Sequence, residues 1–423
     1  MQSYQKMKNS GVAWLSDIPV DWQLKRVSVL FRQRNEKVSD KDYEPLSVTK
    51  NGIVPQLENA AKTNDGDNRK LVLKGDFVIN SRSDRKGSSG LSELDGSVSL
   101  INTVLADGKL YPRYTHNLLR SYPFQEEFYR WGQGIVADLW STNYQRMKSI
   151  QLPVPDHETQ KRIADYLDKE MVRIDELIAK QQHLLRLLEE KRRAIISTAV
   201  TRGIKSDELQ ESSNVWISHV SRGWSVSRLK YFTNLITDGT HITPTYVAEG
   251  VPFLSIKDVS SGKIDFTNCK YISEKEHQAL AKHTRIEKGD ILFTRIGTLG
   301  VNVIIDTDAV FDIFVSLGLL KVIPSSINKD YLVYCMSSGY YLEYIQQVKA
   351  GGDTAAAKFN LGDVANSPII VPPIDEQNKI VEHLNTEVAK LDKLKNKIHK
   401  QIDLLKERRT SLVASVVTGK IKV

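Results

Sequence analysis

The sequence predicts an α+β fold of two mixed globular domains joined by two long antiparallel helices that form a coiled coil. Three observations predict it. The chain repeats itself once with a period of about 200 residues, which is too long for a solenoid and indicates two whole domains. Short β-branched runs alternate with helical patches in the first part of each copy. An unbroken heptad stripe fills the last part of each copy. The length of 423 residues agrees with several domains rather than one.

The duplication is visible as paired motifs. Trp14 is echoed by Trp216 and Trp22 by Trp224, both at an offset of 202 residues. The offset then grows, because the second copy carries extra loop residues, and from Gly134 onward it stays at 217 without a gap. An ungapped match of this length indicates a rigid element whose length matters. We expect the repeated tryptophans to be shared core or partner-facing anchors.

Proline-flanked strands mark the end of each globular domain. The runs Ile150–Pro155 and Ile369–Pro373 must be extended, because proline and the residue before it disfavour a helix. The predicted boundaries follow from these strands and from the repeat. We expect a first globular domain over 1–155, a first helix over 156–204, a second globular domain over 205–373 and a second helix over 374–423.

Each predicted helix carries a coiled-coil seam in which apolar residues recur at alternating spacings of four and three. Each helix has roughly 40 residues and so a length of about 60 Å. The seam positions on which the prediction rests are Leu167, Ile174, Leu185 and Leu188 in the first helix, and Leu384, Leu391, Ile402 and Leu405 in the second. Four polar positions interrupt the stripe: Gln181, Arg192, Lys395 and Arg409. These either set the register, touch a partner or form a solvated edge.

Composition and missing motifs narrow the function. Lys and Arg (59) exceed Asp and Glu (51), which gives a net charge of +8 and a pI near 9.1 that suits a polyanionic partner. The sequence has no phosphate-binding loop, no adenine-methyltransferase motif, no dinucleotide fingerprint and no catalytic histidine arrangement. The two cysteines form no metal signature. We therefore expect no catalytic residue and no metal site. With no apolar run of membrane-spanning length, we expect a cytoplasmic protein without membrane contact.

Several stretches in duplicated order resemble one family. They are the openings WLSDIPVDWQLKRV and WISHVSRGWSVSRL, the stretches DGTHITPTY and GDILFTRIGTLG, the junctions VPDHETQKRI and PPIDEQNKI, and the helix ends STAVTRGI and ASVVTGKI. In this order they resemble the specificity subunits of type I restriction–modification systems over essentially the whole chain. The first junction departs from the usual pattern at His157–Gln160, although Gln160 still aligns with Gln377.

The resemblance implies a non-catalytic subunit in which each globular domain is a target-recognition domain for half of a split double-stranded DNA site. The helices would space the halves and dock two modification subunits, which carry S-adenosylmethionine and methylate adenine. Restriction and motor subunits would add ATP and magnesium, and this chain would bind no cofactor itself. Because the two domains differ in sequence, the bipartite target should be asymmetric.

Loops at equivalent places in the two domains are the candidate DNA-reading elements. Arginine can fork onto guanine and lysine can contact phosphates, and the competing interpretation of each loop is a solvated surface or a turn cap. The candidates are Thr49, Lys50, Arg82, Arg85, Lys86, Tyr144 and Arg146 in the first domain, and His241, Thr243, Lys257, Arg295 and Lys358 in the second.

Two rival functions remain open from the sequence. One is a nuclease whose acidic metal site is hidden by divergence. The other is a coiled-coil scaffold that binds only proteins.

Overall fold

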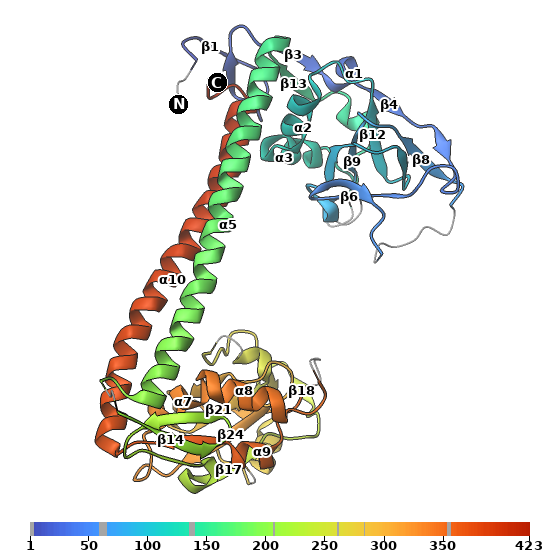
Figure 1. Ribbon diagram of the computed structural model, residues 1–423. Coiled ribbons are helices and arrows are strands. Elements are labelled where there is room, and N and C mark those ends of the chain that lie inside the picture. Colours follow the sequence, from blue (N-terminus) through green and yellow to red (C-terminus); the bar gives the residue numbers. More distant parts are fainter. Residues whose placement is uncertain are drawn as a thin grey trace. The chain divides into compact units, whose positions relative to one another are not determined.

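The computed structural model describes residues 4–58, 66–134, 140–205, 208–259, 262–282, 284–352 and 357–423 (Figure 1). The chain divides into two compact units, each with one globular head and part of both long helices. Unit 1 comprises residues 1–182 and 399–423, and unit 2 comprises residues 183–398. The long helices are α5 (His157–Arg202) and α10 (Ile374–Val417), and both lie inside the ranges expected from the sequence.

The head of unit 1 is built on a four-stranded antiparallel sheet. Its strands, in spatial order, are β10 (Ser89–Leu91), β9 (Phe77–Asn80), β12 (Asn102–Ala106) and β4 (Arg32–Arg34). Smaller pairings are β11 (Gly96–Val98), β8 (Arg69–Val72) and β5 (Lys37–Val38), the hairpin β6 (Leu46–Thr49) and β7 (Gly52–Pro55), and the pair β1 (Met7–Asn9) and β2 (Asp17–Pro19). The helical segments are α1 (Val27–Leu30), η1 (Ser83–Arg85), α2 (Pro112–Arg120), α3 (Tyr122–Arg130) and α4 (Tyr144–Met147).

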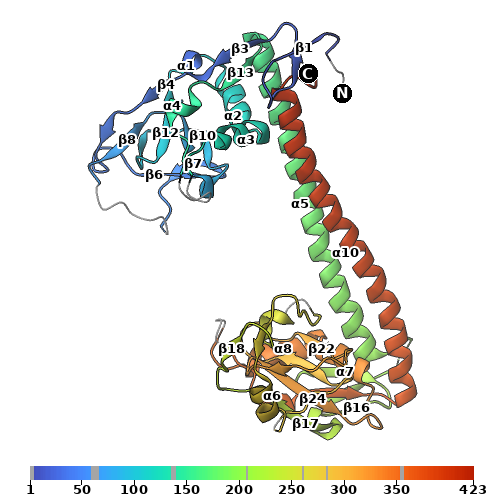
Figure 2. The same ribbon diagram turned by 180° about the vertical axis from the view of Figure 1, so that it is seen from behind.

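Helices α2 and α3 lie between this sheet and the long helices (Figures 1 and 2). Helix α2 begins with Pro112, whose fixed φ suits the first helical position. Tyr114 and Leu118 on α2 are fully buried in the core that also contains Trp22 and, from α5 and α10, Ile174 and Leu412. The head and the helix pair of unit 1 therefore share one hydrophobic core.

The head of unit 2 repeats this plan. Its main sheet has the order β22 (Asn302–Ile304), β21 (Ile291–Thr294), β24 (Leu317–Val322) and β17 (Thr233–Asp238), which is the order of β10, β9, β12 and β4 in unit 1. A second sheet comprises β18 (Tyr246–Val247), β20 (Lys270–Ile272), β19 (Val251–Leu254) and β23 (Asp312–Ile313), and a hairpin pairs β14 (Leu209–Asn214) with β15 (Ile217–Ser221). The helical segments are η3 (Leu229–Phe232), η4 (Ile256–Asp258), α6 (Glu274–Leu280), α7 (Lys329–Met336), α8 (Gly339–Val348) and α9 (Leu361–Asn366).

In each head, the strand that follows the N-terminal strand pair is hydrogen-bonded to the last strand. In unit 1, β3 (Gln23–Arg26) pairs antiparallel with β13 (Gln151–Val154), and in unit 2, β16 (Ser225–Arg228) pairs with β25 (Pro368–Val371). The strands β13 and β25 are the proline-flanked runs identified in the sequence. The chain therefore enters and leaves each head at neighbouring strands.

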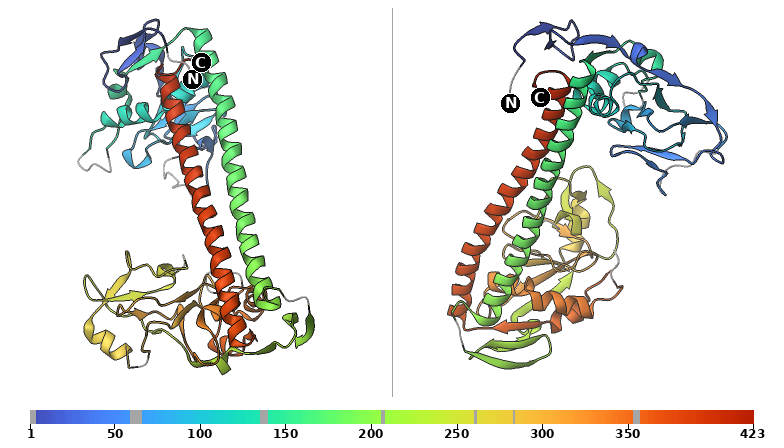
Figure 3. Two further views of the ribbon diagram at one scale, coloured as in Figure 1. Left: turned by 90° about the vertical axis from the view of Figure 1, so that its left-hand side faces the viewer. Right: turned by 45° about the horizontal axis from the view of Figure 1, so that its top comes forward.

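The two long helices pack against each other within each unit (Figure 3). Arg192 donates to Asp392 at 3.0 Å in unit 2, while Lys395 lies 3.9 Å from Glu189. Because positions rise along α5 as they fall along α10, the pairing is antiparallel, as the sequence predicted. The eight predicted seam residues are buried or half-buried.

Two of the polar breaks in the seam form equivalent ion pairs. In unit 1, Arg409 donates to Asp175 at 3.0 Å, which matches the Arg192–Asp392 contact at the same distance in unit 2. Both partners of one pair are shifted by 217 residues relative to the other, in keeping with the repeat. These two arginines therefore make matching contacts between the helices in the two units. Of the helices in the described part of the chain, none is long and apolar enough to cross a membrane.

Candidate nucleic-acid interface

In the first head, the loop after β9 is tied to the segment that precedes α4. The backbone N–H of Ser83 donates to the carbonyl of Trp140 at 2.8 Å, and that of Thr142 donates to the carbonyl of Ser81 at 2.9 Å. Arg82 and Ser141 thereby form an antiparallel bridge. The structure thus brings the candidate loop 81–88 beside the candidate residues of α4.

The three cations of this loop have acidic partners near the surface. Arg82 donates to Asp84 at 2.8 Å, Arg85 lies 3.7 Å from the same carboxylate, and Lys86 donates to Glu126. Ion pairs this exposed are worth about 0–1 kcal/mol, so they are readily exchanged for contacts with phosphates. The loop therefore carries cations that can exchange their acidic partners for the phosphates of a DNA duplex.

The two candidate residues of α4 differ in what their side chains do. The Tyr144 hydroxyl donates to the carbonyl of Phe31 at 3.0 Å, and burial raises the pKa of Tyr144. This contact fastens α4 to the head. Arg146 is half-buried and donates to Gln133, which is itself bridged to Ser141. Arg146 is therefore the α4 residue that the structure presents beside the loop.

Thr49 and Lys50 lie at the tip of the β6–β7 hairpin, which packs beside β10. The Thr49 hydroxyl donates to the carbonyl of Gly52 at 3.0 Å and accepts from the N–H of Asn51 at 3.0 Å, so it shapes the turn. Gly52 has φ of +117°, a conformation that favours glycine. Lys50 is exposed at the tip, and its carbonyl accepts from Arg120.

The second head uses the same construction after β21. Ile296 bridges Lys358, which also bridges Ala350, just as Arg82 and Gln133 both bridge Ser141 in the first head. The sequence paired Arg295 with the Arg82 loop. The bridges align Arg82 with Ile296, one residue further on. The loops are equivalent as expected, but the side chains at matched positions differ.

Arg295 is buried. Its side chain is 4% exposed and donates to Asp238, with longer contacts to the carbonyls of Phe359 (3.4 Å) and Val315 (3.5 Å). A guanidinium held in this way is not offered to a duplex in this conformation. Its burial supports a positioning role for Arg295 in place of the direct contact proposed from the sequence.

The Asp238 carboxylate that pairs with Arg295 also contacts a histidine of its own DGTHITP stretch. His241 Nε2 lies 3.0 Å from Asp238, so Asp238 joins the loop after β17 to the loop after β21. Thr243 is exposed. This convergence was not visible in the sequence, where Asp238 and Arg295 stand in separate motifs.

Lys257 lies in the short helix η4 beside a capping box. Asp258 is buried and accepts from the backbone N–H of Ser255 at 2.7 Å and from its hydroxyl at 2.9 Å. Asp258 is thus a structural cap. Lys257 is exposed, and in the alignment of the repeats it matches Thr49, while Asp258 matches Lys50.

Sequence reasoning missed a set of exposed leucines on the outside of the helix pair. In unit 1 these are Leu177 on α5 and Leu404 on α10, and in unit 2 they are Leu184 and Leu187 on α5 and Leu394 on α10, with exposures between 37% and 53%. Leu177 matches Leu394 and Leu187 matches Leu404 at the repeat offset of 217. A search for repeated apolar residues outside the heptad seam would have found them.

The duplicated heads, the paired loops and the antiparallel helices define a class of two-headed protein with a shared helical framework. Residues 221–404 match the family model of the type I restriction modification DNA specificity domain. Over this part and in its relatives, the chain is similar to the type I restriction–modification specificity subunits.

Several individual specificity subunits are similar to this chain in sequence. The EcoBI specificity subunit of Escherichia coli is 24% identical over 283 residues, which cover 65% of this chain and 59% of that subunit. The MjaVIII specificity subunit of Methanocaldococcus jannaschii is 23% identical over 65% of this chain and 63% of its own length. This chain therefore spans about three-fifths of these two relatives. The putative MjaX specificity subunit of the same archaeon is 24% identical over 99% of this chain and 98% of its own length.

Solved structures share the fold. A chain from a structure of a type I restriction–modification system superposes with a TM-score of 0.68 at 16% identity, covering 96% of this chain and 99% of that one. The HsdS subunit from Thermoanaerobacter tengcongensis gives 0.51 at 17% identity, with 96% and 98% covered. At these identities the likeness concerns the fold alone.

Proposed function

We propose that this chain is the DNA-sequence-reading subunit of a type I restriction–modification complex, and that each head reads one half of an asymmetric bipartite site. The observation that carries the proposal is that the two heads share one framework but carry different residues in their loops. Both heads have the same sheet order and the same bridge between two loops, yet Arg82 and Ser141 stand where the second head has Ile296 and Lys358. An identical scaffold with unlike contact residues is suited to two unlike half-sites.

The experiment is selection of bound duplexes from a random pool, using the full chain together with its modification partner. The expected result is two defined half-sites separated by a gap of fixed length. Replacing residues 1–150 with the same region of a relative should change only one half-site. A change in both halves at once would contradict the modular assignment.

The helix pair is proposed to set the gap between the half-sites. The buried seam residues hold α5 against α10, and the Arg192–Asp392 and Arg409–Asp175 contacts match this register, so the framework resists sliding. Inserting one heptad at matched places in both helices should lengthen the gap without altering either half-site. An unchanged gap would refute this role.

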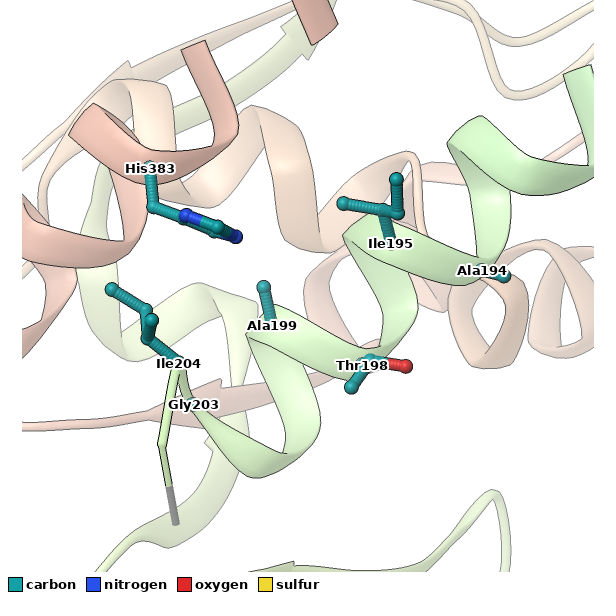
Figure 4. Close-up of a pocket in the computed structure, with 7 residues that line it drawn as sticks. All are labelled: Ala194, Ile195, Thr198, Ala199, Gly203, Ile204 and His383. Atoms are coloured by element: carbon teal, nitrogen blue, oxygen red, sulfur yellow. The ribbon is translucent and has the colours of Figure 1, made fainter. Parts of the chain in front are cut away.

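The exposed leucines support docking of two modification subunits. Leu177 and Leu404 in unit 1 are related by the repeat to Leu394 and Leu187 in unit 2, where α5 also exposes Leu184. Exposed apolar side chains that recur in this way indicate a partner-binding face, and two equivalent faces suit two copies of one partner. In unit 2 the same side of the framework also holds an apolar pocket of about 280 Å³, into which His383 points (Figure 4). Its lining residues are Ala194, Ile195, Thr198, Ala199, Gly203, Ile204 and His383.

Stoichiometry tests this docking face. The pair L177S and L404S should reduce the number of bound modification subunits from two to one, and the pair L187S and L394S should do the same. The matched control is Lys397→Ala, an exposed polar change on the same helix framework. Retention of two partners by both leucine pairs would exclude the face. In this proposal the chemistry belongs to the partners: S-adenosylmethionine would be bound by the modification subunits, and ATP and magnesium by the restriction and motor subunits.

A further inference from the structure

Ile242 stands out on the second head because it is an apolar side chain held in solvent. It is 79% exposed, in the loop 239–245 between β17 and β18. Single exposed apolar residues are common on protein surfaces and need no explanation by themselves. What distinguishes Ile242 is the rigidity of the loop that carries it.

The first end of the loop is anchored in the core of the head. The N–H of Gly239 donates to the carbonyl of Leu317 at 3.1 Å, and that of Thr240 donates to the carbonyl of Ile313 at 3.1 Å. A Cβ at position 239 would lie 2.0 Å from the Ile313 oxygen, so only glycine fits this approach. The buried Asp238–Arg295 ion pair lies directly before this anchor.

The tip and the far end are also fixed. The Thr240 hydroxyl donates to the carbonyl of Ile242 and accepts from its N–H, both at 3.2 Å. The N–H of Thr245 donates to Glu276 on α6 at 3.0 Å. These hydrogen bonds hold Ile242 in a defined position. Because the loop is ordered before a ligand binds, the entropic cost of binding is lower.

The surroundings of Ile242 fit a DNA groove. His241 and Thr243 flank it with exposed polar side chains that can bond to base edges. Just beyond the loop, the Lys270 ammonium lies 3.7 Å from the centre of the Tyr246 ring, which places a cation where a phosphate can be met. The loop also falls within residues 221–404, the part matched by the DNA specificity domain model. The offset between the two copies is 202 before this loop and 208 after it, so the second head carries residues in this region that the first head lacks.

We propose that Ile242 reads a thymine in the half-site of the second head by packing against its C5-methyl group in the major groove. Thymine is the one standard base that shows a methyl group there, so an apolar contact carries sequence information. The inference rests on the proposed function of the chain as a DNA reader, and it names one specificity-determining residue. Asp238 and Arg295 are positioning residues in this scheme, because they hold the loop without touching the base.

The test combines a protein change with a base change. Binding of the full chain with its modification partner is measured on the selected target and on duplexes in which each thymine of the second half-site is replaced by uracil. For the unaltered chain, one uracil replacement should weaken binding about fourfold, the amount expected for one buried methyl group. For I242A, target affinity should fall by a similar factor or more, and the same uracil replacement should have no further effect.

A matched control distinguishes a failure of the Ile242 proposal from a failure of the proposed DNA-reading function. The matched control is V215A, which removes an 88% exposed apolar side chain from the β14–β15 turn and should leave the thymine–uracil difference intact. Thermal unfolding of I242A should be unchanged, because the side chain is exposed. A chain that selects no sequence at all overturns the proposed function. A selective chain whose I242A variant still discriminates thymine from uracil, or whose second half-site has no thymine, overturns the inference alone.

Discussion

Removing the carboxylate of Asp238 should destabilise the second head locally, because it leaves the Arg295 guanidinium buried without its counter-charge. Arg295 is 4% exposed and Asp238 is 13% exposed, and the remaining acceptors of Arg295 are two backbone carbonyls at 3.4 and 3.5 Å. Breaking one partner of a buried pair costs about 3–5 kcal/mol. Because Arg295 keeps these two backbone contacts, we expect the destabilisation by D238A to lie near the lower end of that range, at about 3 kcal/mol. Replacing both partners, as in D238L with R295M, should recover most of this loss, since no charge is then left unpaired.

The assay is hydrogen exchange of the backbone amides in β21 and in residues 295–300, because exchange reports the local opening of this part of the second head. D238A should raise exchange there by roughly two orders of magnitude, which corresponds to about 3 kcal/mol. The control is Asp308→Asn, which breaks the exposed contact with Lys288 at 2.9 Å and should change exchange little. If D238A and D308N behave alike, or if the double variant is no better than D238A, the buried pair does not brace the loops.

Three further outcomes can be measured. Burial, reinforced by the charge of Arg120, lowers the pKa of His116 to about 4; His116 therefore contributes stability that is complete above about pH 6.5 and is lost as the pH falls toward 4, up to about 3 kcal/mol. H116Q should flatten urea-unfolding stability over this range, and an unchanged pH slope would show that other groups dominate. Ile174→Ala in the core of unit 1 should cost about 2–5 kcal/mol in thermal unfolding, whereas Val172→Ala on the exposed face of the same helix should cost under about 0.5 kcal/mol; equal losses would mean that the seam is not packed. Arg85→Ala should leave folding intact and reduce the slope of log affinity against log salt by about 0.9 if Arg85 meets one phosphate, and an unchanged slope would remove it from the interface.

The helical framework was predictable from the sequence because its physics is periodic. A spacing of four and three places residues such as Leu167, Ile174, Leu384 and Leu391 on one helix face, and a helix with so narrow an apolar face needs a partner. The duplication then predicted two heads of one plan. The common sheet order and the matching bridges of the two heads bear this out.

The candidate site was predictable only as a set of loops. Asp238 and Arg295 are 57 positions apart, and their contact depends on how β17 and β21 flank β24, which no local pattern encodes. For the same reason the sequence proposes Arg295 for DNA contact but does not reveal that its side chain is buried. The exposed leucines escaped notice because heptad analysis directs attention to the seam and away from the opposite helix face.

The strand pairs β3–β13 and β16–β25 have a consequence for how such proteins change over generations. In each head, the segment between these two strands starts and ends at adjacent hydrogen-bonded strands, so a stretch of gene coding for that segment can be exchanged while both ends still meet. Selection on a new recognition sequence then acts on the transplanted segment, and the helices inherited from the old gene need no compensating mutation.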